Sequence, residues 1–482
     1  MDWEHLLDSY IIFLNGDQTK YRMLILIKNY FVKYKIFIMM TSLISQEIPN
    51  EFFEFKRDKI LIDSGENWEN LSTFGPLRYY SNSFKSDSLM VRSKFGVKFS
   101  NKNKALYVYG HFTFRNYFHG YLYPRIVTNP NSIERFTGVP RDIKRRGFSS
   151  GETDLSGITF EKDWMMFQFG RGRQSWGAGN NLQLAVSETS PAYDYGMIDL
   201  NFSNLRVRYF HGYLESDSSQ NNRYINGRGI EYKNNKSLII GLSEIIIYSG
   251  ENRNFDYAYL NPISTHLEIE LNQRQNLEGT DSGNGVWQIS IDYLSQKKNR
   301  FSFNYMFDEF IFDKSQLNDG KEKFNAYSFK ILKNIFKSNS HIVSTYLSRI
   351  TVGKNTFRHE NGNNNFVQRN KPLGHLLGSD FEITEIGLSS LINQNLIISI
   401  QLGRKEEGGN SILNNPYNPY YFNNDVSNAR ERTTFIRYET QLWYNKKYSI
   451  FLNNEYAFNS NKKPDISLEI GFDIYANILT VL

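Results

Sequence analysis

The segment 170–191 gathers residue types that can bind a charged or polyhydroxylated ligand. Between its glycines it carries Arg171, Arg173 and Trp176. A guanidinium group can pair with a carboxylate or phosphate through two parallel hydrogen bonds, and aromatic faces suit the C–H surfaces of sugars. A phosphate-binding loop is not indicated, because the GxxxxGK[ST] spacing is missing and no helix is expected to follow. The alternative is a loop at a strand end that folds into the protein and packs on Trp176.

A second pair of arginines, Arg206 and Arg208, alternates with apolar residues, which places both on one face of a strand. Together with Arg171 and Arg173 they are candidates to line a polar lumen. The alternative is that these arginines neutralise nearby carboxylates such as Asp194. For any single arginine we favour this alternative.

The histidines suggest little catalytic chemistry. Alternate spacing puts His266, Glu268 and Glu270 on one face of a predicted strand, but a second histidine and the HExxH pattern are missing there. His375 lies between leucines, and we interpret it as a packed histidine. With Asp380 it nevertheless joins the candidates for the lumen.

Composition narrows the function further. The chain of 482 residues contains no cysteine, which excludes disulfides, thiolate metal sites and cysteine nucleophiles. Its net charge of +6 is modest for this length, so no nucleic-acid partner is expected. No catalytic constellation emerges, and we expect no enzymatic activity, no cofactor and no metal.

The scaffold for these candidates is best seen in the hairpin from Val286 to Phe307. Its two arms alternate apolar and polar residues on either side of a short basic turn, and a period of two is typical of strands. In the first arm, the apolar face holds Trp287, Ile289, Ile291 and Tyr293, and the polar face holds Gln288, Ser290 and Asp292. So large an apolar face must pack against a second sheet or a lipid bilayer.

Composition favours the bilayer. Tyr (32) and Phe (37) are abundant, as in the aromatic girdles of membrane barrels. In the arm from Thr433 to Tyr444, one face carries Arg437, Glu439 and Gln441, which is costly in a sandwich core but suits a wet lumen. The sequence therefore predicts an all-β protein, a transmembrane antiparallel β-barrel of about 16–18 strands with long extracellular loops and a plugged lumen.

The chain divides into three parts. Residues 47–87 form a predicted periplasmic lead-in, and residues 88–482 form the barrel, with hairpins across 101–104, 161–163, 233–236 and 445–447 and a last strand over 466–474. Residues 124–153 predict a long outer loop whose basic residues could meet acidic lipopolysaccharide or glycan. These basic residues are Arg141, Lys144, Arg145 and Arg146.

Residues 1–46 are predicted to be a leader. Within 23–46, three lysines precede a short apolar core and small polar residues, the layout of a secretory signal peptide. The apolar run is too short for a spanning helix. Residues 1–22 are acidic and do not fit a signal, so we expect translation to start at Met23.

Three segments resemble the Wzi capsule assembly family. The first reads Gly170-Arg171, Trp176-Gly177-Ala178-Gly179, Leu182, Leu184, Ser187 and Pro191. The others are 261–268 and 372–380, the latter similar to the family's LGHxxGxD element. All three occur in family order, although Ser175 stands where relatives usually have another tryptophan.

The resemblance implies a non-enzymatic, lectin-like protein in the outer membrane of a Gram-negative bacterium. Such a protein holds capsular polysaccharide or exopolysaccharide at the cell surface, surrounded by outer-membrane lipid and served by polysaccharide export machinery. The resemblance thus makes the residues singled out above candidates to bind polysaccharide as well as to line the lumen: Arg171, Arg173, Trp176, Arg206, Arg208, His375 and Asp380. The alternative is an outer-membrane porin or a substrate-specific channel, which shares every argument for a barrel. A plugged lumen favours the first interpretation.

Overall fold

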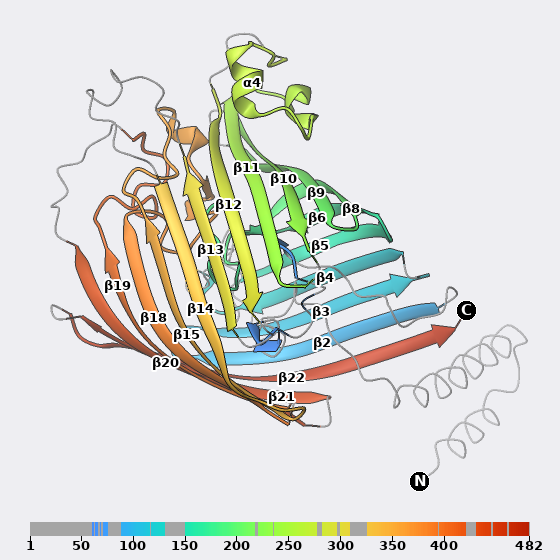
Figure 1. The fold of residues 1–482 in the computed structure, drawn as a ribbon, viewed down its shortest axis with the longest axis vertical. Coiled ribbons are helices and arrows are strands. Elements are labelled where there is room, and N and C mark those ends of the chain that lie inside the picture. The colour runs from blue at the N-terminus through green and yellow to red at the C-terminus, as the bar shows by residue number, and fades with distance from the viewer. Residues whose placement is uncertain are drawn as a thin grey trace, which may run out of the picture.

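The two-sided strands close into a barrel in the computed structural model (Figure 1). The structure describes residues 60–61, 63–65, 68, 71–75 and 88–481, except 116, 131–149, 217–219, 235, 277–281, 296–298, 309–324, 394, 421–429, 445–446 and 460–461. Within this part of the chain, eighteen strands form the barrel.

The barrel strands are β2 (Ser88–Ser100), β3 (Lys104–Phe114), β4 (Phe118–Val127), β5 (Ser150–Lys162), β6 (Met165–Gly172), β8 (Tyr193–Phe202), β9 (Leu205–Ser216), β10 (Asn221–Lys233), β11 (Leu238–Glu251), β12 (Asn284–Ser295), β13 (Asn299–Phe307), β14 (Asn325–Lys337), β15 (His341–Val352), β18 (Phe381–Ile392), β19 (Leu396–Glu407), β20 (Glu431–Tyr444), β21 (Tyr448–Asn459) and β22 (Asp465–Val481). Short elements outside the barrel wall include β1 (Phe74–Gly75), β7 (Ser175–Trp176), β16 (Val367–Gln368), β17 (Lys371–Pro372), η5 (Tyr257–Leu260), α4 (His266–Leu271) and η6 (Gly362–Asn364).

Every barrel strand pairs antiparallel with its neighbours, and β22 returns to pair with β2 from Ser88↔Val481 to Ser100↔Glu469. Closure leaves no sheet edge whose backbone groups would stay unpaired in lipid. The predicted antiparallel barrel and its strand number are confirmed. Among the described helices, none combines the length and apolar character needed to cross a membrane.

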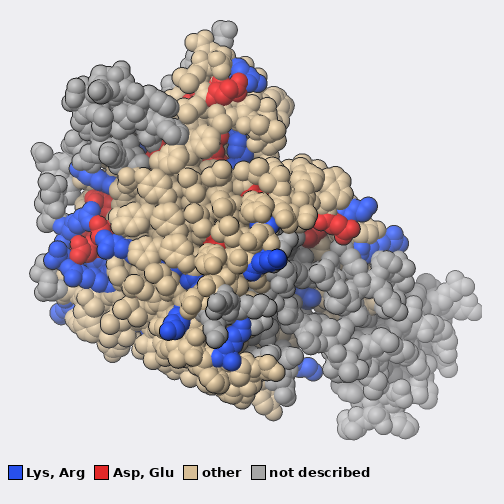
Figure 2. All heavy atoms as spheres, viewed as in Figure 1, with Lys and Arg blue, Asp and Glu red and all other residues tan. Residues whose placement is uncertain are grey.

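The predicted faces are also confirmed. In the β12–β13 hairpin, Trp287 pairs with Phe307 and Tyr293 with Phe301. The side chains of Tyr293 and Ile289 are exposed on the outer wall. The buried inward residues are Gln288, Ser290 and Asp292. Charged side chains are sparse on the middle of the outer wall and gather in one dense group at its left edge (Figure 2).

The barrel has two different ends. The start of β2 and the end of β22 lie together at the end with the short connections, such as 163–164 and 203–204, which we call the turn end. The longer connections, such as 173–192, 252–283 and 353–380, emerge at the opposite loop end. In outer-membrane barrels the short turns are periplasmic and the long loops extracellular.

Two predicted boundaries were wrong. The loop 124–153 is shorter than expected, because β4 continues to Val127 and β5 already begins at Ser150. The register shifts between Tyr123 and Pro124, and such a bulge accommodates a proline within a ladder. The last strand extends beyond 466–474 to Asp465–Val481.

The predicted strand through His266, Glu268 and Glu270 was also wrong, because these residues form the helix α4. The hydroxyl of Thr265 accepts a hydrogen bond from the Glu268 backbone N–H at 3.2 Å and caps the helix. The three side chains therefore do not share a strand face. The leader 1–46 and the basic residues between Arg141 and Arg146 lie outside the described residues.

Candidate functional site: a plugged lumen with a charged wall

Four chain segments enter the barrel, and together we call them the plug. They are the described residues of 60–75, the connections 173–192 and 353–380, and residues 408–420. The first two join in a small sheet in which Phe74 pairs with Trp176, and Gly177 donates its N–H to the Thr73 carbonyl at 2.8 Å. The described part of the expected lead-in 47–87 thus lies within the lumen.

Polar residues of the inner wall hold the connection 173–192. Asn304 donates to the Ala178 carbonyl at 2.9 Å and accepts from the Ala178 N–H at 2.6 Å. Ser328 donates to the Leu182 carbonyl at 2.7 Å. The polar face expected for a wet lumen is therefore largely satisfied by plug backbone. The alternative interpretation of 170–191, a loop that folds inward, is confirmed.

The N-terminal segment is anchored by charges. Asp63 pairs with Arg300 at 2.8 Å and with Lys330 at 2.6 Å. Farther along, Thr73 donates both its N–H and its hydroxyl to the carboxylate of Glu231 at 2.5 and 2.6 Å. These buried pairs fix the segment because removing one partner would leave a buried charge unpaired.

The connection 353–380 is held by Arg223 on the inner face of β10. Its guanidinium group donates to the carbonyls of Asn363, Asn365 and Val367 at 2.5, 2.7 and 2.9 Å. The same connection meets 173–192, because Ser187 donates its hydroxyl to the Gly374 carbonyl at 2.6 Å. The plug segments thus support one another as well as the wall.

An apolar core fills the plugged half of the lumen. Trp176 is only 1% exposed, and its ring lies 4.8 Å from Phe74 and 5.2 Å from Phe210 between centroids. The cluster continues through Leu184, Leu373, Phe381 and Ile412 to the wall residues of β11–β15. With both ring faces enclosed, Trp176 serves packing in this structure.

The predicted arginines were placed in three environments. Arg206 and Arg208 face the lumen, where both donate to Asp199 at 2.8 and 2.5 Å. Arg173 is buried and binds Asp154 and the Ser190 carbonyl, which it reaches at 2.6 Å. These three neutralise lumenal carboxylates or anchor the plug.

Arg171 does not line the lumen. It shares the outward face of β6 with the exposed Phe167 and Phe169, and it pairs with the exposed Asp194 at 3.4 Å. The expectation that it faces inward was wrong. Side chains two residues apart in a strand lie on the same face, so Arg171 faces outward like Phe167 and Phe169.

His375 and Asp380 belong to the plug near the loop end. The His375 ring stacks on Phe381 with centroids 4.6 Å apart, and its Nδ1 accepts from the Leu377 N–H at 3.2 Å. Enclosure in the barrel, with added repulsion from Lys405 and Arg437, lowers the pKa of His375 to about 4.

Asp380 organises the neighbouring connection. It adopts a positive φ of 56° and accepts from the Asn410 N–H at 3.2 Å, while its backbone carbonyl accepts from Gly408 at 2.7 Å. The Arg430 guanidinium group lies 3.6 Å from its carboxylate. Asp380 therefore joins the ends of two plug connections.

The inner wall opposite the apolar core is charged and only partly covered. Its ion pairs are Lys98–Glu469 at 2.9 Å, Arg437–Glu455 at 2.8 Å and Lys405–Glu407 at 2.8 Å. All lie on inward positions of β2 and β19–β22, and the Arg437 and Glu455 side chains remain 35% and 37% exposed. We call this surface the charged inner wall. Solvent therefore reaches this part of the lumen.

An apolar cluster lines β15, β18–β20 and β22 nearer the turn end. It contains the inward residues Ile342, Leu391, Ile397, Trp443 and Tyr475, with Ile60 of the plug packed among them. The charged inner wall thus lies between the loop end and this buried cluster. Sequence alternation had indicated Arg437 as a lumen residue, but the other members of the wall had not been singled out.

A second charged group lies outside the barrel at the loop ends of β15 and β18–β20. Arg349 pairs with Glu382 at 2.7 Å, and Arg432 pairs with Glu406 at 3.2 Å. Arg430 reaches Glu382 at 3.2 Å. Among the described residues, no group of three or more potential metal-ligating side chains could hold a metal ion.

Close packing inside the plug generates a first prediction. A Cβ added at Gly374 would stand 1.9 Å from the Leu184 carbonyl oxygen. The Gly374→Ala substitution should therefore force two plug segments apart and lower the free energy of unfolding by about 1–3 kcal/mol. Thermal unfolding in detergent would measure the change. Gly110→Ala is the control, since nothing lies within 4 Å of its added Cβ; equal stability of both variants would contradict the packing.

The depressed pKa of His375 generates a second prediction. The folded state keeps this imidazole neutral down to about pH 4, whereas the unfolded chain is protonated below about pH 6.5. Stability should fall as the pH drops from about 6.5 through about 4. His375→Asn keeps a hydrogen-bond acceptor but does not titrate, so its unfolding temperature should fall less between pH 7 and pH 4.5. An identical loss in both proteins would refute this contribution.

Comparison with known proteins supports the fold. No model of a protein family matches the chain, and no curated protein has a matching sequence. The structure is similar to Wzi of Escherichia coli, described as an outer-membrane protein involved in group 1 capsule assembly and a carbohydrate-binding β-barrel. The TM-score is 0.62 at 12% identity, over 88% of this chain and 98% of that one.

Weaker matches include OprD of Pseudomonas aeruginosa, with a TM-score of 0.45 at 9% identity over 82% of this chain and 96% of that one. OccK3 of the same organism has a TM-score of 0.44 at 8% identity, over the same shares of the two chains. The resemblance to the Wzi capsule assembly family, expected from three short segments, is thus confirmed at the level of the fold: this chain has the architecture of an outer-membrane β-barrel similar to Wzi.

Proposed function

We propose that this protein is a non-enzymatic, lectin-like barrel in the outer membrane of a Gram-negative bacterium. It holds capsular polysaccharide or exopolysaccharide at the cell surface and does not conduct solutes. The signal peptide expected at 23–46 would direct its export, and polysaccharide export machinery would supply the glycan.

The observation that carries this proposal is the plug. Its segments contribute to an apolar core with Trp176 near its centre, and they are bonded to the wall from several strands by residues such as Asn304 and Arg223. A solute path through this half would require breaking buried hydrogen bonds, each of which leaves polar groups unsatisfied. Such a barrel is better suited to binding than to diffusion.

The charged inner wall is the surface we assign to the glycan. It offers guanidinium, ammonium and carboxylate groups on rigid strands, reachable from the loop end, where extracellular polysaccharide would lie. Arg437 can pair with a uronate carboxylate in place of Glu455, and Glu455 or Glu469 can accept from sugar hydroxyl groups. The likeness of the fold to carbohydrate-binding Wzi supports the same choice.

The competing function is a channel. The partly exposed charged inner wall favours it, because a row of charges of both signs is also suited to a water-filled path. The apolar cluster around Trp443 and Ile60 opposes it, since that cluster lies between the charged inner wall and the turn end.

Conductance separates the two functions. The purified barrel in planar lipid bilayers should give no stable single-channel currents, because the plug and the apolar cluster place buried apolar side chains across the lumen. Current would be recorded at rising voltage in 1 M salt, a condition chosen to make a small current visible. Reproducible single-channel current steps at low voltage would contradict the anchoring function and favour the channel.

Polysaccharide retention tests the binding surface. A deletion strain should shed glycan into the medium and regain cell-bound glycan with the wild-type gene. Arg437→Gln should weaken retention about tenfold, because one charge-assisted contact is lost. Arg432→Gln is the matched control, since Arg432 lies on the outward face of the same strand. Both variants must reach the outer membrane in equal amounts.

Two results would count against this assignment. Unchanged cell-bound glycan in the deletion strain would reject the proposed function altogether. A normal Arg437→Gln strain beside a defective deletion strain would keep the function and remove the charged inner wall as its site.

A further inference from the structure

One loop of this barrel folds back over the outside of the wall. Residues 252–276, between β11 and β12, contain η5 and α4, and we call them the outer flap (Figure 1). Ile246 and Tyr248 lie on the outward face of β11 together with the exposed Leu242, yet both are fully buried. They pack against Tyr259 and Ile269 of the flap.

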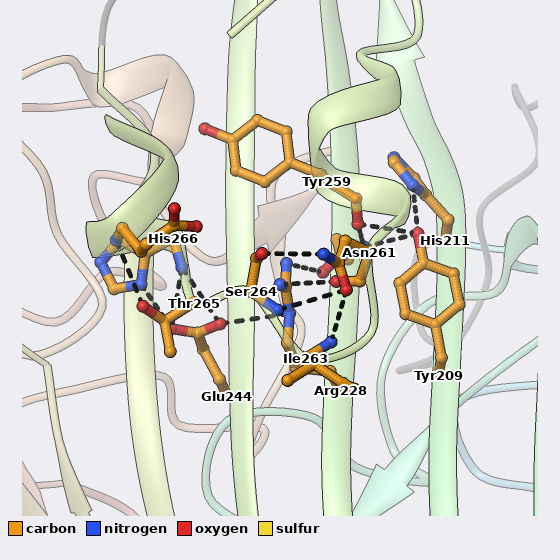
Figure 3. Close-up of polar contacts among 12 residues, drawn as sticks. Tyr209, His211, Arg228, Glu244, Tyr259, Asn261, Ile263, Ser264, Thr265 and His266 are labelled. Carbon is orange, nitrogen blue, oxygen red and sulfur yellow. Dashed lines mark hydrogen bonds and ion pairs between the residues drawn. The ribbon is translucent and has the colours of Figure 1, made fainter. Parts of the chain in front are cut away.

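Beneath the flap, the outward face of the wall carries charges. Arg228 of β10 and Glu244 of β11 form an ion pair at 3.2 Å. Glu244 also binds His266, accepting from its backbone N–H at 3.2 Å and pairing with its ring Nδ1 at 2.7 Å. Arg228 donates to the Asn261 carbonyl at 2.9 Å. Figure 3 shows these contacts between the strands and the segment that joins η5 to α4.

A second group of contacts fixes the flap beside this pair. Tyr209 and Asn226, also outward-facing, donate to the Tyr259 carbonyl at 3.0 and 2.9 Å. The His211 ring lies 2.9 Å from the hydroxyl group of Tyr209 (Figure 3). Its other nitrogen lies 2.7 Å from the hydroxyl group of Tyr248. The flap is therefore a bonded part of the outer wall, with side-chain and backbone anchors on three strands.

The flap reaches the depth of the lipid. The exposed Tyr232 and Tyr293 lie near the turn end, where an interfacial aromatic girdle is expected. Leu238, which pairs with Tyr293, begins β11, and Glu244 lies six residues farther along. Six residues span about 20 Å of strand, or about 15 Å along the barrel axis at a tilt of about 40°. The apolar band of such barrels is about 25 Å tall, so Glu244 lies within it.

The outer surface of the flap exposes large apolar side chains, beside polar residues such as Asn261, Asn272 and Arg274. Ile263 is 85% exposed, Leu271 77% and Tyr257 70%. Ile263 lies between Asn261, which contacts Arg228, and His266, which contacts Glu244 (Figure 3). The exposed Leu242 on β11 continues this apolar surface toward the turn end.

We propose that the outer flap is a lipid-contacting part of the barrel wall. Ile263 and the neighbouring apolar side chains contact the acyl chains of the outer leaflet, while the flap shields Arg228 and Glu244 from lipid. Continuity with the lipid-facing residues of β10–β12 selects lipid as the occupant. This contact does not depend on whether the barrel binds polysaccharide.

The absence of cysteine from the sequence allows a direct test with single-cysteine variants. Ile263→Cys would carry an environment-sensitive fluorophore in phosphatidylcholine vesicles that contain 5-doxyl phosphatidylcholine. We expect quenching by the doxyl lipid comparable to that of Leu242→Cys on the outer wall, and at least threefold weaker quenching by aqueous iodide than at Glu360→Cys, an exposed site in the connection 353–380.

Three outcomes would overturn the proposal. Quenching of the Ile263→Cys label by iodide alone would place the flap in water. Rapid disulfide cross-linking between two copies through this cysteine would assign the surface to a second chain. Equal lipid quenching at Ile263→Cys and Glu360→Cys would show that the label itself seeks the bilayer. Because Ile263 is almost fully exposed, its replacement leaves the anchoring contacts of the flap in place, so folding is not at risk.

Discussion

The structure depends on one constraint: a strand in lipid must pair every backbone group and offer only one side chain in two to the membrane. Closure between β2 and β22 meets the first demand, and strict alternation meets the second. The other half of the side chains then faces inward, and many of these side chains are polar. Enclosing these polar groups without hydrogen-bond partners would cost free energy, and the plug supplies such partners. The plug therefore follows from the same constraint as the wall. Asn304 illustrates this, since both the oxygen and the nitrogen of its side-chain amide bind the plug backbone.

Alternation could be recognised from the sequence because it is local. The hairpin from Val286 to Phe307 and the inward position of Arg437 follow from residues a few positions apart. A plugged lumen could be predicted, but the contacts of the plug could not, because they join distant segments: Asn304 and Ala178 are 126 residues apart, and Arg223 and Asn363 are 140 apart. The residue pattern within one strand does not predict contacts between segments so far apart in the sequence.

The same limit explains the candidate arginines. Residue type and spacing put Arg206 and Arg208 in the lumen, but their carboxylate partner, Asp199, is set by pairing between β8 and β9. The sequence does not distinguish an arginine that is buried in an ion pair from one that is accessible to a ligand. The difference lies in coverage, which leaves Arg437 partly exposed and Arg208 enclosed, and coverage is decided by where the plug ends.

The outer flap obeys the constraint from the other side of the wall. Arg228 and Glu244 interrupt the apolar alternation of β10 and β11 at outward positions, an interruption visible in the sequence but without meaning until its cover is known. At the depth of the lipid, two such charged side chains need an ion-pair partner and a protein segment that separates them from the acyl chains. Arg228 and Glu244 form an ion pair at 3.2 Å, and the flap covers the pair and binds it through Asn261 and His266. A polar residue on the lipid side of a strand can thus indicate where a loop packs on the outer wall, just as a polar residue on the lumen side indicates where the plug binds.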